Sequence, residues 1–259
     1  MIVLTGTVSR DLDTAVTVIT FRGELTMRTK HVFRTTVRKC LAEQPLAVVV
    51  DLSEIVDRAA TTTIAMLHAL HREASEREPA VALLWCAPPG ELAEHLSRQW
   101  LDVLRVYETR ELALAAAGDA LPPSHRAHIR LPGTHVAVGL ARNLVFDACM
   151  SWALPEIAYR ARRVVSELAT NAVEHAGTDF EVHVVLRDPM IYLAVRDGSS
   201  ARPVILDPAR GCSQQPLDAR GRGLSIVGRE SVSWGCLEAT EGKLVWALLR
   251  ISCQAAERG

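Results

Sequence analysis

The stretch 164–177 has the periodicity of an amphipathic helix, and it constrains the fold of this chain more than any other feature. Its apolar residues recur at intervals of three and four, which places them on one stripe: Val165, Leu168, Ala169, Ala172 and Ala176. Gly177 follows directly and is a common helix stop, and Pro155 suits a first turn. We therefore predict a helix over 155–176 with one apolar face.

A second, polar stripe on this helix carries the candidate chemistry. Glu167 and Asn171 are one turn apart, so a carboxylate and an amide oxygen project side by side. Hard oxygen ligands of this kind suit Mg²⁺, and a carboxylate can also act as a general base. The alternative is a solvated helix face, because Glu and Asn are common on exposed helices.

Two downstream motifs favour the first interpretation. Asp197-Gly198 ends an apolar run, and Gly221-Arg222-Gly223-Leu224 opens another. Together with Glu-x-x-x-Asn-Ala-x-x-His-Ala at 167–176, their order and spacing resemble the GHKL (Bergerat) ATP-binding domain, in particular the bacterial anti-sigma factor serine kinases. The resemblance covers about the C-terminal half of the chain. It is neither the P-loop nor the Rossmann pattern.

The resemblance implies a role for each matching residue. Glu167 is the expected general base, Asn171 the Mg²⁺ ligand, and Asp197 the acceptor for the exocyclic amine of adenine, with Gly198 allowing close approach of the base. Residues 199–219 correspond to a mobile lid. The remaining expected nucleotide contacts are His175, Arg220, Gly221, Arg222, Gly223 and Leu224. Glycine backbone amides at a helix start favour phosphate oxygens.

The N-terminal half alternates strands and helices, which predicts an α/β domain with parallel strands. We expect strands at 2–8, 15–22, 47–52, 81–85 and 103–107, and helices at 28–43, 60–77, 90–99 and 109–117. With Arg22-Gly23-Glu24-Leu25 and Val49-Val50-Asp51-Leu52-Ser53, this order resembles the STAS domain of anti-sigma factor antagonists over residues 1–118. The predicted fold class is thus a STAS-like α/β domain followed by a GHKL α/β sandwich.

The phosphorylation motif of that family is altered in this chain. Where the family has Asp-Ser-Ser-Gly at a helix start, this chain has Ala59-Ala60-Thr61-Thr62. Thr61 falls at the phospho-acceptor position, and a helix N-terminus favours a phosphate. The alternative is that Thr61 is only a capping or first-turn threonine.

The composition of the chain limits which other functions are possible. The 259 residues suffice for two modest domains, and 29 Lys plus Arg against 30 Asp plus Glu give no electrostatic case for nucleic-acid binding. The six cysteines are scattered without a Cys-x-x-Cys pair, and neither a signal peptide nor a membrane span is visible, so a cytoplasmic protein is expected. We expect domains at 1–118 and 128–252, a linker at 119–127 and a tail at 253–259.

Two functions are compatible with these motifs. One is a Mg²⁺·ATP-dependent protein serine/threonine kinase in partner-switching control of transcription, with a sigma factor or an anti-sigma factor antagonist as partner. The other is a non-catalytic ATP-binding module that sequesters such a partner, with the STAS-like domain controlling it in cis. The kinases that the chain resembles are often dimers, so a homodimer is one expectation.

Overall fold

We analysed a computed structural model that describes residues 3–11, 14–58, 60–99, 104–119, 125–201, 223–239 and 242–251. The chain divides into two compact units, Met1–Pro122 and Pro123–Gly259, which are described separately. The division falls within the segment 119–127 for which the sequence predicts a linker. In the described residues, no helix is both long and apolar enough to cross a membrane.

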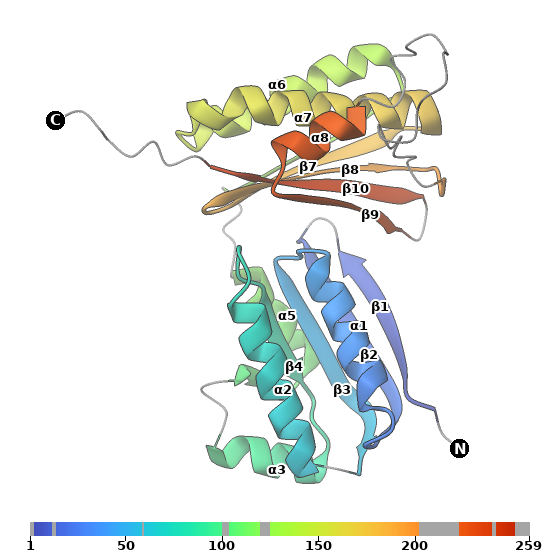
Figure 1. The fold of residues 1–259 in the computed structure, drawn as a ribbon, viewed down its shortest axis with the longest axis vertical. Helices are drawn as coiled ribbons and strands as arrows, with labels where there is room; N and C mark the ends of the chain where they lie inside the picture. Colours follow the sequence, from blue (N-terminus) through green and yellow to red (C-terminus); the bar gives the residue numbers. More distant parts are fainter. Residues whose placement is uncertain are drawn as a thin grey trace, which may run out of the picture. The chain divides into compact units, whose positions relative to one another are not determined.

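The first unit is an α/β structure around a five-stranded sheet of order β1-β2-β3-β4-β5 (Figure 1). β1 pairs with β2 antiparallel, and the other neighbours are parallel, as the strand–helix alternation predicts. Its strands are β1 (Thr5–Asp11), β2 (Val16–Leu25), β3 (Ala47–Asp57), β4 (Ala82–Cys86) and β5 (Val106–Tyr107). Its helices are α1 (Lys30–Ala42), α2 (Ala60–Ser75), α3 (Gly90–Gln99) and α5 (Arg110–Asp119).

Both faces of this sheet are covered by helices. Residues of α1, α2 and α3 share one core with Phe21, Val50 and Trp85, while Ala113 and Ala117 of α5 pack on the opposite face. β3 extends to Asp57, five residues beyond the predicted strand end, because β2 continues beside it as far as Leu25. The polar residues at 53, 54 and 57 end the apolar run but do not end the strand.

The second unit has two layers, a sheet of order β6-β7-β8-β10-β9 and helices on one of its faces (Figure 1). All neighbouring strands are antiparallel. Its strands are β6 (Arg126–Leu131), β7 (Phe180–Arg187), β8 (Met190–Asp197), β9 (Ser233–Glu238) and β10 (Lys243–Arg250). Its helices are α6 (His135–Ser151), α7 (Pro155–Asn171) and α8 (Gly223–Glu230).

Alternate strand residues and the apolar stripe of α7 form one core. Val182, Val184, Leu193 and Val195 are fully or almost fully buried in the same cluster as Val165. The alternate residues of these strands therefore pack against the apolar stripe that the sequence predicts for the helix.

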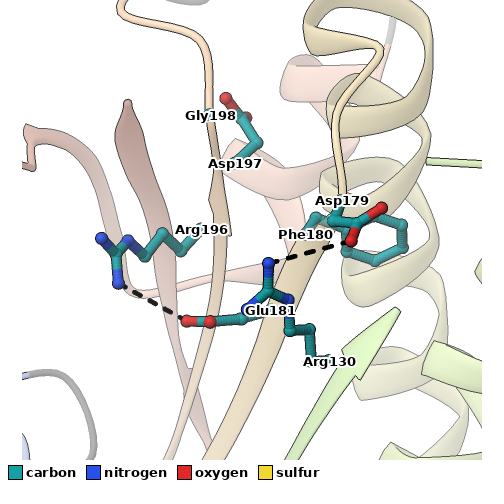
Figure 2. A pocket seen from close by; sticks show the side chains of 7 residues that line it. All are labelled: Arg130, Asp179, Phe180, Glu181, Arg196, Asp197 and Gly198. Carbon is teal, nitrogen blue, oxygen red and sulfur yellow. Dashed lines mark ion pairs between the residues drawn. The ribbon is translucent and has the colours of Figure 1, made fainter. Parts of the chain in front are cut away.

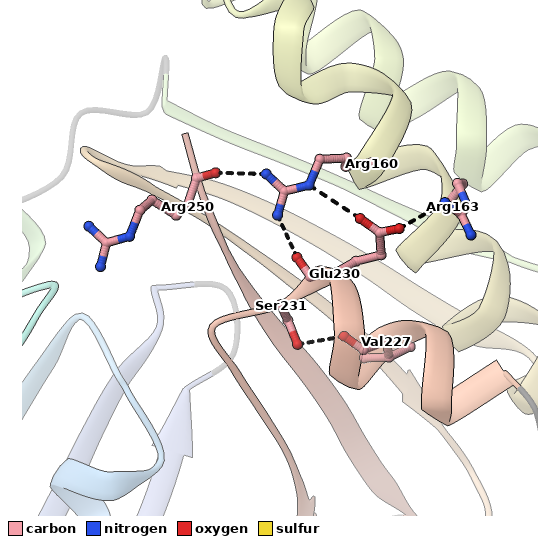
Figure 3. A network of polar contacts seen from close by, with 6 residues as sticks. All are labelled: Arg160, Arg163, Val227, Glu230, Ser231 and Arg250. Carbon is pink, nitrogen blue, oxygen red and sulfur yellow. Dashed lines mark hydrogen bonds and ion pairs between the residues drawn. The ribbon is translucent and has the colours of Figure 1, made fainter. Parts of the chain in front are cut away.

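A polar cluster fixes α8 against α7 (Figure 3). Arg160 of α7 donates to the Glu230 carboxylate at 3.3 Å, to the Glu230 carbonyl at 2.7 Å and to the Arg250 carbonyl at 3.2 Å. Arg163 donates to the other oxygen of Glu230 at 2.8 Å. Because one guanidinium bridges a helix end and a strand end, α8 is held at its C-terminus, and its first residue faces the last turns of α7.

Candidate functional site

The C-terminal end of α7 departs from a regular α-helix. α7 ends at Asn171, and residues Ala172–Ala176 continue it as a π-helical turn in which the Gly177 amide donates to the Ala172 carbonyl at 3.3 Å. Gly177 then takes the left-handed conformation at φ 61° and ends the helix, as the sequence predicts. The periodicity alone does not predict the π turn, which changes the direction of side chains after Asn171.

The first and third sequence motifs meet at Glu167 and Gly223. A Cβ atom built on Gly223 would lie 2.5 Å from Oε2 of Glu167, so the carboxylate lies against the backbone at the start of α8. Burial raises the pKa of Glu167, Arg163 opposes this shift, and Glu174 adds to it. Residues 56 positions apart in sequence are thus in direct contact.

Asn171 brings an amide next to this carboxylate. Its Nδ2 atom is buried, and none of the residues that the structure describes accepts a hydrogen bond from it. Buried side-chain amides are normally hydrogen-bonded, so an amide in this state at a helix end needs an explanation, and a ligand is one.

The second motif lies at the end of β8. Asp197 is buried, and its Oδ1 atom accepts hydrogen bonds from Lys243 Nζ at 2.8 Å and from the Ser199 amide at 2.9 Å. Lys243 is the first residue of β10 and lies directly opposite Asp197 in the register. The sequence analysis missed Lys243, because only the pairing of β8 with β10 reveals the contact.

The end of the helix and the end of β8 are also joined. The Gly198 amide donates to Oγ1 of Thr178 at 2.9 Å. Thr178 lies two residues after Ala176, where the π-helical turn ends. A Cβ atom on Gly198 would lie 3.1 Å from this hydroxyl, so the two segments are closely packed. The first motif therefore contacts the third through Glu167, and Thr178, two residues after the first motif, contacts the second.

The remaining residues predicted to contact the nucleotide do not gather at this point. Leu224 is 5% exposed and belongs to the core, and the His175 side chain is exposed. Arg220, Gly221 and Arg222 lie outside the described residues, as does most of the segment 199–219 predicted as a lid. Of the third motif, the structure thus describes Gly223, which lies against Glu167, and Leu224, which packs in the core.

A cavity of about 210 Å³ lies beside Asp197 and Gly198 (Figure 2). Its lining is strongly charged, with ion pairs Arg130–Asp179 at 3.8 Å and Arg196–Glu181 at 3.6 Å. Phe180 completes the lining. The cavity is therefore lined by charged side chains where β7 begins and β8 ends.

In the first unit, the predicted acceptor lies at a helix start. Thr61 is in the first turn of α2, and its neighbour Thr62 is exposed and accepts a hydrogen bond from the Lys30 ammonium group. Thr63 is fully buried and donates to Oδ1 of Asp57 at 3.1 Å. Burial lowers the pKa of Lys30, and Asp57 opposes this shift. Sequence reasoning did not single out Lys30 or Asp57, which come from the ends of other elements.

Comparison with known proteins identifies the first unit. Residues 8–107 match the family model described as "Mlab, STAS domain". This model ends before the second unit begins. No curated protein matches the chain.

Several solved structures are similar to part of the chain. An anti-sigma factor antagonist from Mycobacterium paratuberculosis is 23% identical, and the match covers 44% of this chain and 93% of that one, with a TM-score of 0.37. The anti-sigma factor antagonist SpoIIAA in its unphosphorylated form is 13% identical, with coverage of 43% and 95% and a TM-score of 0.35. The phosphorylated form of SpoIIAA from Bacillus is 13% identical, with coverage of 43% and 98% and a TM-score of 0.34. The family match confirms the resemblance of the N-terminal region to a STAS domain.

Proposed function

We propose that the second unit binds Mg²⁺·ATP at the end of α7, and that the chain is a regulator of the partner-switching type. The observation that carries this proposal is the contact between Glu167 and Gly223. It brings the helix with the polar stripe to the start of α8, where free backbone N–H groups and the helix dipole favour phosphate.

The donor groups at this site suit the proposed ligand. Glu167 and Asn171 offer hard oxygens of the kind that Mg²⁺ prefers, and the buried Nδ2 of Asn171, which has no acceptor in the described part of the chain, could donate to a bound group. Mg²⁺·ATP, when bound, supplies the phosphoryl group and its counter-charge. The Glu167 carboxylate would orient an acceptor hydroxyl and take its proton, a task for which a raised pKa is suited.

The STAS domain at the N-terminus supports protein partners as the targets of regulation. Under the kinase proposal, the acceptor hydroxyl belongs to a separate antagonist protein or to Thr61 of this chain. The partner would be a sigma factor or an anti-sigma factor antagonist.

One observation favours the second candidate, a nucleotide-binding module without phosphate transfer. Asp197, the expected adenine contact, is already paired with Lys243 in a buried position. An amine of the base would compete with this ammonium group for the same carboxylate. A site that binds ATP weakly would act as a sensor or a scaffold for partners.

Phosphate transfer distinguishes the two candidates. The full chain is incubated with γ-labelled ATP and Mg²⁺, alone and with STAS antagonist proteins from the same cell, and labelled threonine and serine are quantified. The kinase proposal predicts label on an acceptor that Glu167→Gln abolishes. ATP binding without any transfer supports the non-catalytic module, and equal transfer by Glu167→Gln overturns the role of Glu167.

A further inference from the structure

A second cluster of potential ligands lies in the second unit, on the sheet face that its helices do not cover. His128 of β6 and His183 of β7 are directly opposite each other in the antiparallel register. Glu181 precedes His183 by two residues, so both point to the same face of the sheet. Their neighbours Val182 and Val184 point to the helix-covered core.

The three side chains are close enough to share one ion. The imidazole rings of His128 and His183 stack with centroids 4.4 Å apart and planes inclined by 21°. His183 Nε2 lies 3.8 Å from Glu181 Oε2, and one ligand atom from each of the three residues lies within 4.8 Å of the others. Glu181 also lines the cavity beside Asp197, but none of the three residues is an expected nucleotide contact at the end of α7.

We propose that His128, Glu181 and His183 bind a divalent transition metal ion, with Zn²⁺ as the best match. Two imidazoles and one carboxylate are a common donor set for Zn²⁺, which they hold with the fourth position open to water. Bonds of ~2.0–2.1 Å in a tetrahedral site place ligand atoms roughly 3.4 Å apart. Side-chain rotation of His128, which is exposed, brings the atoms together while the paired backbones stay in register.

A neighbouring arginine opposes the metal ion. Arg196 of β8 lies directly opposite Glu181, and its Nη1 atom is 3.6 Å from Glu181 Oε2. A metal ion would replace this guanidinium as the partner of the carboxylate. The arginine therefore lowers the affinity of this site for a metal ion, and its removal should strengthen binding. Zn²⁺ bound elsewhere on the surface would not respond to the loss of Arg196.

The proposal is tested by titrating the tag-free full chain with ZnCl₂ in a calorimeter. We expect one Zn²⁺ per chain at this site, at least about tenfold weaker binding in His128→Ala and His183→Ala, and tighter binding in Arg196→Gln. His135→Ala, which removes an exposed histidine of α6 outside the cluster, is the matched control and should bind as wild type. Because His128 is exposed, its variant tests the site even where His183→Ala, at a buried position, fails to fold.

Co²⁺ identifies the ligands independently. The proposal predicts a tetrahedral or five-coordinate Co²⁺ spectrum without a thiolate charge-transfer band. That band would assign the ion to cysteines and overturn the proposal. Equal Zn²⁺ affinity in wild type and His128→Ala, or no Zn²⁺ binding by wild type, would also overturn it.

Discussion

Lys243 and Asp197 form a buried ion pair of 2.8 Å between the first residue of β10 and the last residue of β8. Both side chains are at most 4% exposed. The pair joins two strands that are separated in sequence by 45 residues, and it occupies the carboxylate for which an adenine contact is expected. It therefore links the stability of the pairing between β8 and β10 to the proposed nucleotide site.

Removal of one partner should be more harmful than removal of both. Asp197→Asn or Lys243→Met leaves a buried charge without compensation, which costs about 3–5 kcal/mol. The double variant Asp197→Asn/Lys243→Met should lose less unfolding free energy than either single variant. Urea unfolding of wild type, both single variants and the double variant measures this coupling, and strict additivity would show that the pair does not interact.

Gly242 should be intolerant of any side chain. It has φ 94°, and a Cβ atom there would lie 1.8 Å from the Asp197 carbonyl oxygen. Gly242→Ala therefore forces β10 away from β8, and we expect a loss of at least about 2–3 kcal/mol in unfolding free energy.

Gly139→Ala is the matched control for this prediction. Gly139 lies inside α6, and its nearest neighbour to an added Cβ is Nη2 of Arg142 at 3.7 Å. This change should stabilise the chain by about 0.5–1 kcal/mol, because alanine is the better helix former. Similar effects of the two substitutions in thermal or urea unfolding would contradict the described geometry at Gly242.

Glu167→Gln should separate stability from phosphate transfer. Burial raises the pKa of Glu167 in the folded chain, so its ionised form weakens the fold. This destabilisation is absent below the pKa that Glu167 has in the unfolded chain. It grows as the pH rises through the higher pKa that Glu167 has in the folded chain. The variant should thus be at least as stable as wild type at neutral pH, with the difference vanishing in acid, while phosphate transfer is lost.

Unfolding curves across this pH range test the Glu167 prediction. A variant that is less stable than wild type at neutral pH, by a difference that disappears in acid, would have the wrong sign for a carboxyl group with a raised pKa. It would indicate instead that the carboxylate stabilises the fold through Arg163.

Thr63 and Thr62 should differ in their contribution to stability. Thr63 is fully buried and donates to Asp57, so Thr63→Val loses a hydrogen bond to a carboxylate, at a cost of about 1.5–3 kcal/mol. Thr62 is exposed, and Thr62→Val should cost less than about 1 kcal/mol. Urea unfolding of the two variants makes the comparison, and the reverse order would contradict the roles assigned to the two hydroxyl groups.

The local pattern of the sequence predicts most elements of the first unit and the long helix of the second. The helix predicted at 28–43 is observed as Lys30–Ala42, and the helix predicted at 90–99 is observed with the same limits. Their hydrophobic periods are strong because each element buries one face. The limits of β3 and the π turn after Asn171 were not predicted, because strand pairing and local backbone geometry decide them.

The contacts across the sheet could not be predicted in the same way. Lys243 is 46 residues from Asp197, and His128 is 55 residues from His183. Each pair meets only through the antiparallel register, which a single sequence does not specify. For Glu167 and Gly223, the order of motifs indicated proximity, but the direct contact follows from the way Arg160 and Glu230 hold α8.

Calorimetric titration of the full chain with Mg²⁺·ATP tests the central proposal most directly. The matched variants are Asn171→Ala, which removes the proposed metal ligand, and Asn143→Ala, which removes an exposed amide of α6. We expect saturable binding by wild type and Asn143→Ala, and binding at least about tenfold weaker in Asn171→Ala. Wild-type binding that Asn171→Ala leaves unchanged, or no binding of Mg²⁺·ATP by wild type, would contradict a nucleotide site at the end of α7.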